Sequence, residues 1–196
     1  MSLNPMSLNN AALDIATGIA GGLVATWVTD RAGKLLWAAT PVEEREREPD
    51  EMKESSSKVA ARKLVEHCPV PATEENIERT KTTVHYGLGL TWATLYTALR
   101  RSTDMRPQTA GMATGIALSL VVDETLCPLL DITPPNDAFP ASAHIRGFVT
   151  HAIWGLSVAA VAETLNLALG NQTGKTFNAA GNRRSVVEHP RNGRSA

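Results

Sequence analysis

Four long apolar segments, almost free of ionisable side chains, constrain the fold of this chain more than any other feature. They cover approximately residues 13–37, 84–100, 110–130 and 147–169. Spanning a bilayer takes about 20 largely apolar residues, whereas runs of about 10 to 14 are more typical of buried helices in soluble proteins. The segments lie at this boundary. They are rich in Gly, Ala, Ser and Thr, which let membrane helices approach one another closely.

The distribution of charge favours a membrane protein. Ionisable side chains concentrate in residues 42–82, in the short loop Arg100 to Arg106 and in the tail after Lys175, while the formal net charge is only -1. Helices of a soluble bundle carry charged residues on an outer face at about every turn, and these segments lack that pattern. Only lipid removes the need for a polar outer face. We therefore predict an all-α, four-span transmembrane helical bundle, with a soluble helical bundle as the alternative.

The remaining parts of the chain flank or connect these spans. We predict an N-terminal tail over residues 1–10, a four-helix membrane domain over 11–170 with a charged loop at 42–82, and a disordered C-terminal tail over 171–196. No cleavable signal is expected, because the first ten residues contain neither Lys nor Arg. Within the charged loop, Ser57 to His67 has helical spacing and is either part of a solvated loop or a helix at the membrane interface.

An internal repeat divides the spans into two tandem helical hairpins. The first segment aligns with the third without gaps, and the second aligns in the same way with the fourth. The matched residues are Gly18 with Gly111, Gly22 with Gly115, Asp30 with Asp123, His85 with His151, and Gly89 with Gly155. Because small residues four apart lie on one helix face, we predict that these six glycines pack the helices together.

The repeat also predicts a polar cluster. Two hairpins inserted with the same orientation bring the ends of the outgoing helices and the starts of the returning helices to one membrane face. The predicted cluster consists of Asp30, Asp123, His85 and His151, with Glu124 and Glu163 as further members. In the alternative interpretation, the aspartates lie near the lipid headgroups and are balanced by Arg31, Lys34 or the histidines. Glu163 either extends a hydrophilic path or reaches the opposite interface.

Several functional classes are excluded or left open by residue type. Carboxylate and imidazole together suit a divalent transition metal or a proton relay, and no metal ligand set can be chosen from sequence. The chain has no HExxH motif and no nucleophile elbow, so no enzyme activity is predicted. The near-neutral balance argues against nucleic-acid binding. Two cysteines, Cys68 and Cys127, are too few for a disulfide scaffold or a Cys-rich zinc site.

Part of the chain resembles a known family. The motif Gly111-x-x-x-Gly115, the prolines Pro128 and Pro140, the run Thr133-Pro134-Pro135 and the motif His151-x-x-Trp154 resemble the second half of the YagU-like proteins. These are small bacterial inner-membrane proteins whose domain has no assigned function. The resemblance implies an inner-membrane protein with cytoplasmic termini, and it brings no activity, ligand or catalytic residue. In that family the place of Asp123 can hold histidine, and Asp30 has no firm counterpart.

These observations lead to two functional hypotheses. The first is the handling of a small solute, a metal ion or a proton through the Asp/His cluster. The second is a non-catalytic membrane scaffold or assembly partner, in which Gly/Ala stripes pack helices within or between copies. The expected partners are the lipid bilayer and either a further copy of the chain or another membrane protein. The arginines of the loop Arg100 to Arg106 and of the tail place both termini in the cytoplasm by the positive-inside rule, whereas Arg31, Lys34, Arg79, Lys81 and Arg146 argue for the opposite orientation.

Overall fold

The computed structural model describes residues 5–49 and 54–170, with side chains described from residue 10 onward. Every regular element in these ranges is a helix, so the all-α prediction is confirmed for them. Residues 5–10, predicted to be part of an N-terminal tail, form the start of the first helix. The predicted disordered tail over 171–196 lies outside the described residues.

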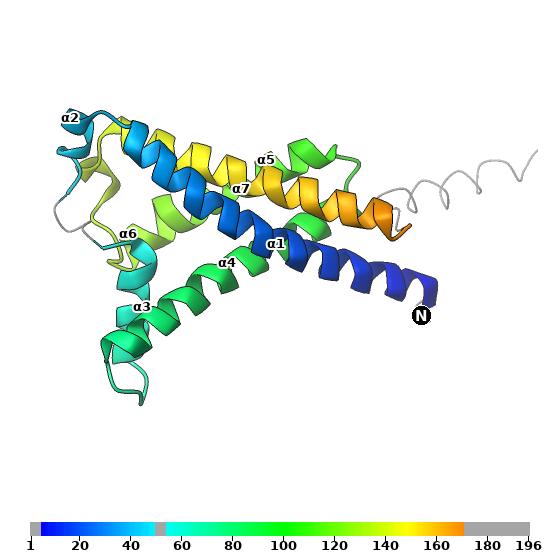
Figure 1. The fold of residues 1–196 in the computed structure, drawn as a ribbon, viewed down its shortest axis with the longest axis horizontal. Coiled ribbons are helices and arrows are strands. Elements are labelled where there is room, and N and C mark those ends of the chain that lie inside the picture. Colours follow the sequence, from blue (N-terminus) through cyan, green and yellow to red (C-terminus); the bar gives the residue numbers. More distant parts are fainter. Residues whose placement is uncertain (1–4, 50–53, 171–196) are drawn as a thin grey trace, which may run out of the picture.

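Four helical stretches form the body of the molecule (Figure 1). They are α1 (Pro5–Ala39), α4 (Glu74–Ser102), the continuous run of α5 (Pro107–Leu118), π-helix η2 (Ser119–Leu126) and α6 (Cys127–Leu129), and α7 (Ala141–Ala168). Shorter elements are α2 (Val42–Arg45), α3 (Ser56–Glu66) and the 3-10 turn η3 (Asn136–Ala138). Helix α1 packs against α4 and α7, and α5 packs against α7. The N-terminal end of α1 and the C-terminal end of α7 lie at the same end of the bundle (Figure 1).

Three helical stretches of the described residues are long and apolar enough to cross a membrane. They are Asn10–Ala39, Pro107–Leu129 and Ala141–Ala168. The second predicted span, 84–100, lies within α4, which is not among them. The reason is visible in its composition, because α4 starts with a charged stretch from Glu74 to Lys81 and its apolar part is interrupted by threonines. The structure therefore supports three candidate spans, and the fourth span and the tandem-hairpin arrangement stay predictions.

Helix α3 and the first part of α4 pack together and form an arm within the predicted charged loop. Helix α4 begins there because the Thr73 side chain accepts a hydrogen bond from the backbone N–H of Asn76 at 3.3 Å. Helix α3 packs on the first part of α4, away from the bundle (Figure 1). Lys58 of α3 forms ion pairs with Glu74 and Glu78 of α4. Hydrogen bonds to these carboxylates raise the pKa of Lys58, and hydrogen bonds from Lys81 and Lys58 lower the pKa of Glu78.

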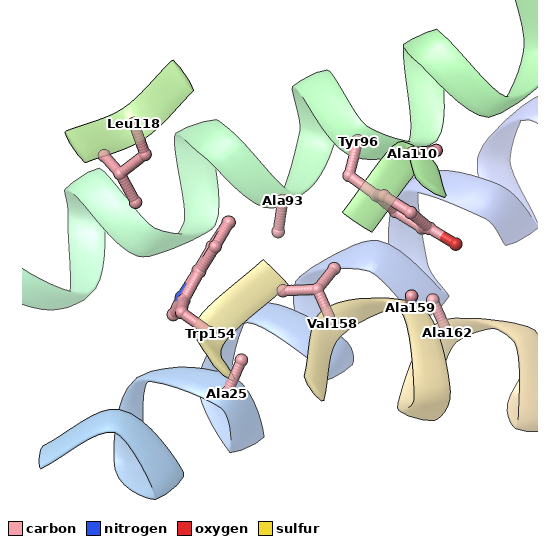
Figure 2. Close-up of a cluster of buried hydrophobic side chains, with 9 residues drawn as sticks. All are labelled: Ala25, Ala93, Tyr96, Ala110, Leu118, Trp154, Val158, Ala159 and Ala162. Carbon is pink, nitrogen blue, oxygen red and sulfur yellow. The ribbon is translucent and has the colours of Figure 1, made fainter. Parts of the chain in front are cut away.

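The interior of the bundle is built mainly from small side chains. Figure 2 shows Trp154 and Val158 of α7 pointing between the helices toward Ala93, with further alanines around them. The large apolar side chains of the long helices point outward instead. Examples with more than a third of their surface exposed are Ile15, Leu23, Trp27, Ile116, Leu120 and Val149. A water-soluble bundle buries such residues, whereas membrane helices pack through small residues and expose large ones to lipid.

Glycines allow the closest contacts between these helices. A Cβ built on Gly111 would lie 2.5 Å from the carbonyl oxygen of Gly155, and one built on Gly155 would collide with the carbonyl oxygen of Gly111. Gly115 meets the backbone of His151 in the same way. Between α1 and α4 the contacts involve side chains, since a Cβ on Gly22 would lie 2.8 Å from the Cβ of Ala93. Gly18 faces Thr97, and Gly89 faces Thr26.

We expect Gly155→Ala to destabilise the bundle by about 1–3 kcal/mol, because the added methyl group meets backbone that cannot rotate away. Gly87 provides a matched control on α4, since a Cβ there meets nothing within 4 Å. Gly87→Ala should leave stability unchanged or raise it by up to about 1 kcal/mol through helix propensity. Unfolding midpoints of the two variants in the same detergent measure the difference. Equal midpoints would contradict close backbone packing between α5 and α7.

Candidate functional site

The first predicted pair, Asp30 and His85, is formed between α1 and α4. Nε2 of His85 lies 2.9 Å from Oδ1 of Asp30. An ionised carboxylate only accepts hydrogen bonds, so the imidazole nitrogen donates. The two side chains retain 38% and 42% of their exposure, for His85 and Asp30 respectively. The pair is therefore formed but not sealed from its surroundings.

The second pair, Asp123 of η2 and His151 of α7, is more enclosed. Nδ1 of His151 lies 3.1 Å from Oδ2 of Asp123 and 3.0 Å from the carbonyl oxygen of Gly147. Because a carbonyl oxygen only accepts, Nδ1 carries a proton. The Ser119 hydroxyl donates to the same Asp123 oxygen at 3.1 Å, and Ser119 is fully buried. Asp123 is thus held from inside the bundle by Ser119 and from α7 by the imidazole.

Both pairs line one cavity with a volume of about 720 Å³. The lining residues come from α1, α3, α4, η2 and α7. Figure 1 shows that the N-terminal part of α4 diverges from α1. The residues that line the cavity lie on this side of the molecule, at the end away from the N-terminus of α1. The structure therefore brings four of the six predicted cluster residues, namely Asp30, His85, Asp123 and His151, to the wall of a single cavity.

Asp123 lies in the π-helix η2, a feature that the sequence pattern did not reveal. Pro128 has no backbone N–H, so the carbonyl group of Glu124 lacks its usual helical donor. The side-chain amide of Asn136 donates to that carbonyl oxygen at 2.8 Å instead. The matching aspartate, Asp30, lies in regular α-helix. The two pairs therefore differ in backbone geometry, and π-helical turns are frequent at functional sites.

Glu124 faces a second, smaller cavity of about 280 Å³. Its Oε1 lies 2.8 Å from Nδ1 of His144, whose Nε2 lies 3.1 Å from the carbonyl oxygen of Asn136. When Glu124 is ionised, its carboxylate and the Asn136 carbonyl are both hydrogen-bond acceptors. The His144 ring can donate to both only when both of its nitrogens carry protons. His144 was not among the predicted cluster residues. The available signal was its spacing of two helical turns from His151, which places both on one face of α7.

Glu163 lies near the end of α7 opposite the cavity, where it contacts α4 rather than the cluster. Its Oε1 lies 2.9 Å from Nε of Arg100 and accepts a hydrogen bond from the Tyr96 hydroxyl at 3.0 Å. Arg101 forms a second ion pair there with Asp14 of α1, which is 1% exposed. Arg100 was predicted at the boundary between the span 84–100 and the loop, and Arg101 in the loop. Both lie in the last turn of α4, where carboxylates on neighbouring helices balance their charge.

The side chains that line the cavity do not match the usual ligand set of a resident metal ion. Within the described ranges, no group of three or more His, Cys, Asp or Glu side chains is arranged to hold one. Each pair offers one carboxylate and one imidazole, whereas zinc sites in proteins use three or four protein ligands.

Comparison of the chain with protein-family models, with curated proteins and with solved structures found no match. The resemblance to the YagU-like proteins thus stays a prediction. Any function of the cavity has to be inferred from the residues that form it, since no relative supplies a ligand or an activity.

We expect Arg100→Leu to destabilise the bundle by about 3–5 kcal/mol, because it leaves the Glu163 carboxylate without its cation in a largely enclosed site. The paired side chains retain only 10% and 22% exposure. The double variant Arg100→Leu/Glu163→Leu should recover most of this loss, since it removes both charges. Arg106→Leu, at an exposed position, serves as the control. Unfolding in detergent measures all three, and a double variant no more stable than the single one would contradict the coupling.

Proposed function

We propose that this chain is an integral protein of the bacterial inner membrane that binds a small solute in the cavity lined by the two Asp–His pairs. The observation that carries this proposal is the meeting of both pairs at one cavity of about 720 Å³. Small-molecule sites are concave and mostly apolar, with a few polar groups that orient the ligand. This cavity has that character, with Leu88, Val122 and Leu126 among its apolar walls.

The outward-facing large apolar side chains support the membrane location, and two tryptophans support a boundary near the cavity. The Arg31 guanidinium lies 3.6 Å from the ring centroid of Trp27, and Arg146 lies 4.7 Å from that of Trp37. Both tryptophans are exposed, at 52% and 42% respectively. Tryptophan and long basic side chains concentrate where hydrocarbon meets headgroups. We infer that the cavity opens near this boundary.

The orientation follows from the position of the chain ends. The start of α1 and the end of α7 lie at the end of the bundle away from the cavity (Figure 1). With both termini in the cytoplasm, as the positive-inside rule favours, the cavity opens toward the periplasm. Membership of the YagU-like proteins, proposed on the motifs from Gly111 to Trp154, agrees with this orientation.

The glycine stripes do not favour the scaffold hypothesis in the form that joins separate copies of the chain. Glycine stripes that join separate copies must be available on the outer surface. Here Gly18 and Gly22 face α4, and Gly111 and Gly115 face α7 of the same chain. A scaffold would have to use the large apolar faces instead, which lipid also covers. A scaffold therefore remains one outcome of the experiments below and is not the preferred function.

Cell fractionation tests the membrane location first. We expect the full chain to sediment with membranes after lysis without detergent, to resist extraction by alkaline carbonate, and to dissolve in detergent. The physical reason is the exposed apolar surface of α1, α5 and α7, because contact between large apolar patches and water is unfavourable. Recovery of the chain in the soluble pool would contradict the membrane location and the proposed function together.

Thiol labelling tests whether solutes enter the cavity. In a chain with Cys68→Ser and Cys127→Ser, we expect Leu88→Cys, on the cavity wall, to react with charged methanethiosulfonates, both the sulfonatoethyl and the trimethylammonium-ethyl reagent. Leu95→Cys is the control, because Leu95 is exposed on the same helix in its apolar part and does not line the cavity. Charged reagents do not enter hydrocarbon, so the control should react much more slowly. Equal, slow labelling of both would contradict a solute-accessible cavity.

A further inference from the structure

When its histidines are neutral, the large cavity carries more negative than positive charge. Asp30 and Asp123 contribute two carboxylates to the wall. Of the two lysines that line it, Lys81 lies 3.0 Å from Glu78 and is thus already paired. Lys34 forms none of the ion pairs observed among the described residues. One negative charge therefore remains to be balanced in the cavity.

The remaining wall suits a ligand with an apolar body. Aliphatic side chains such as Val84, Leu88 and Ile132 line part of it, and Tyr86 adds an aromatic ring that contacts His85 edge-on with centroids 5.8 Å apart. Aromatic faces attract cations, most strongly where water is excluded. An organic cation would satisfy both features, since its charge would meet a carboxylate while its carbon atoms contact Val122 and Leu126. A simple hydrated ion would leave the apolar wall unused.

Imidazolium and a bound cation would compete for the same oxygen atoms. His85 approaches Asp30 at 2.9 Å and His151 approaches Asp123 at 3.1 Å. Imidazole changes its charge between about pH 5 and 8 in ordinary surroundings. Protonated histidines would balance both carboxylates and leave no site for a second positive charge. Neutral histidines would leave the carboxylates available.

Other charged groups around the pairs do not remove this competition. Lys34 and Lys81 face the large cavity from α1 and α4. The smaller cavity, which Asp123 and His151 also line, contains Glu124, His144, Glu48 and Arg146, which form the pairs Glu124 with His144 and Glu48 with Arg146. Since these four groups are matched among themselves, the groups that can carry positive charge in direct contact with the two aspartates are His85 and His151.

We propose that the large cavity binds a small organic cation with an apolar body in exchange for protons held by His85 and His151. This inference rests on the proposed function and names its ligand class. When the cation binds, its charge contacts Asp30 or Asp123, and a proton leaves the adjacent imidazole for the surrounding water. No covalent bond forms, and the total charge of the cavity is conserved for each proton exchanged.

Isothermal titration of the full chain in lipid nanodiscs tests the proposal. The probe is butyltrimethylammonium, and butanesulfonate of the same chain length is the matched anion. We expect the cation to bind and the anion not to bind, with cation affinity rising up to about tenfold per pH unit for each linked histidine between about pH 5.5 and about pH 7.5. Titration in two buffers of different ionisation enthalpy should show proton release.

Three variants separate the parts of the proposal. Asp30→Asn/Asp123→Asn should abolish binding, and His85→Gln/His151→Gln should retain binding but lose its pH dependence and proton release. Glu75→Gln is the charge control, because Glu75 lies outside the large cavity and pairs with Arg79. A thermal unfolding curve for each variant checks that it folds.

The outcomes are distinguishable. Binding of butanesulfonate in place of the cation, or cation binding without proton release, overturns this inference and leaves a solute-binding cavity intact. Failure of both probes also overturns it, and the labelling of Leu88→Cys then decides the proposed function separately. Loss of binding in Glu75→Gln would show that general surface charge, rather than the two aspartates, attracts the cation.

Discussion

The close approach of helix backbones at glycine determines how the rest of this chain is arranged. Where Gly111 and Gly155 meet, no side chain separates α5 from α7. Helices this close leave little internal volume, so the core is made of alanine with a few larger residues such as Trp154 and Val158. The large apolar side chains then have no interior to occupy and point outward. Lipid is the solvent in which such an arrangement is stable.

The same constraint decides where polar groups can lie. The narrow middle of the bundle has room for small hydroxyl side chains such as Ser119 but not for hydrated ion pairs. Charged side chains are found toward the two ends, where the helices separate or where a neighbouring helix supplies the opposite charge. At one end Glu163 balances Arg100, and at the other the Asp–His pairs line a cavity. The first arrangement is compatible with a structural role, because its charges are mutually satisfied, whereas the second leaves space for a ligand.

Local spacing in the sequence was sufficient to predict some of these features and insufficient for others. The all-α class follows from apolar segments without strand-like alternation. The repeat predicted that Asp30 and His85 come together, but not that both lie inside longer helices rather than at helix ends, since α1 runs to Ala39 and α4 begins at Glu74. The π-helix could not be predicted, because the donor that satisfies the Glu124 carbonyl within it is the Asn136 side chain, which only the fold brings there. The pairing of Glu124 with His144 and of Arg101 with Asp14 depends on which helices become neighbours. Propensity and periodicity carry no information on that choice.

The middle of the bundle also limits how a solute could leave the cavity. Between the Asp–His pairs and the Arg100–Glu163 pair, the described core holds mainly small apolar side chains around Ala93 and Val158, with buried hydroxyl groups such as those of Thr26 and Thr114. A ligand bound beside Asp30 can therefore leave only through the opening by which it entered, unless helices move. Movement between α5 and α7 is opposed by backbone-to-backbone contact, whereas α1 and α4 meet through side chains such as Ala93. A passage that opened between α1 and α4, next to the less enclosed Asp30–His85 pair, would therefore disturb fewer close backbone contacts than one between α5 and α7.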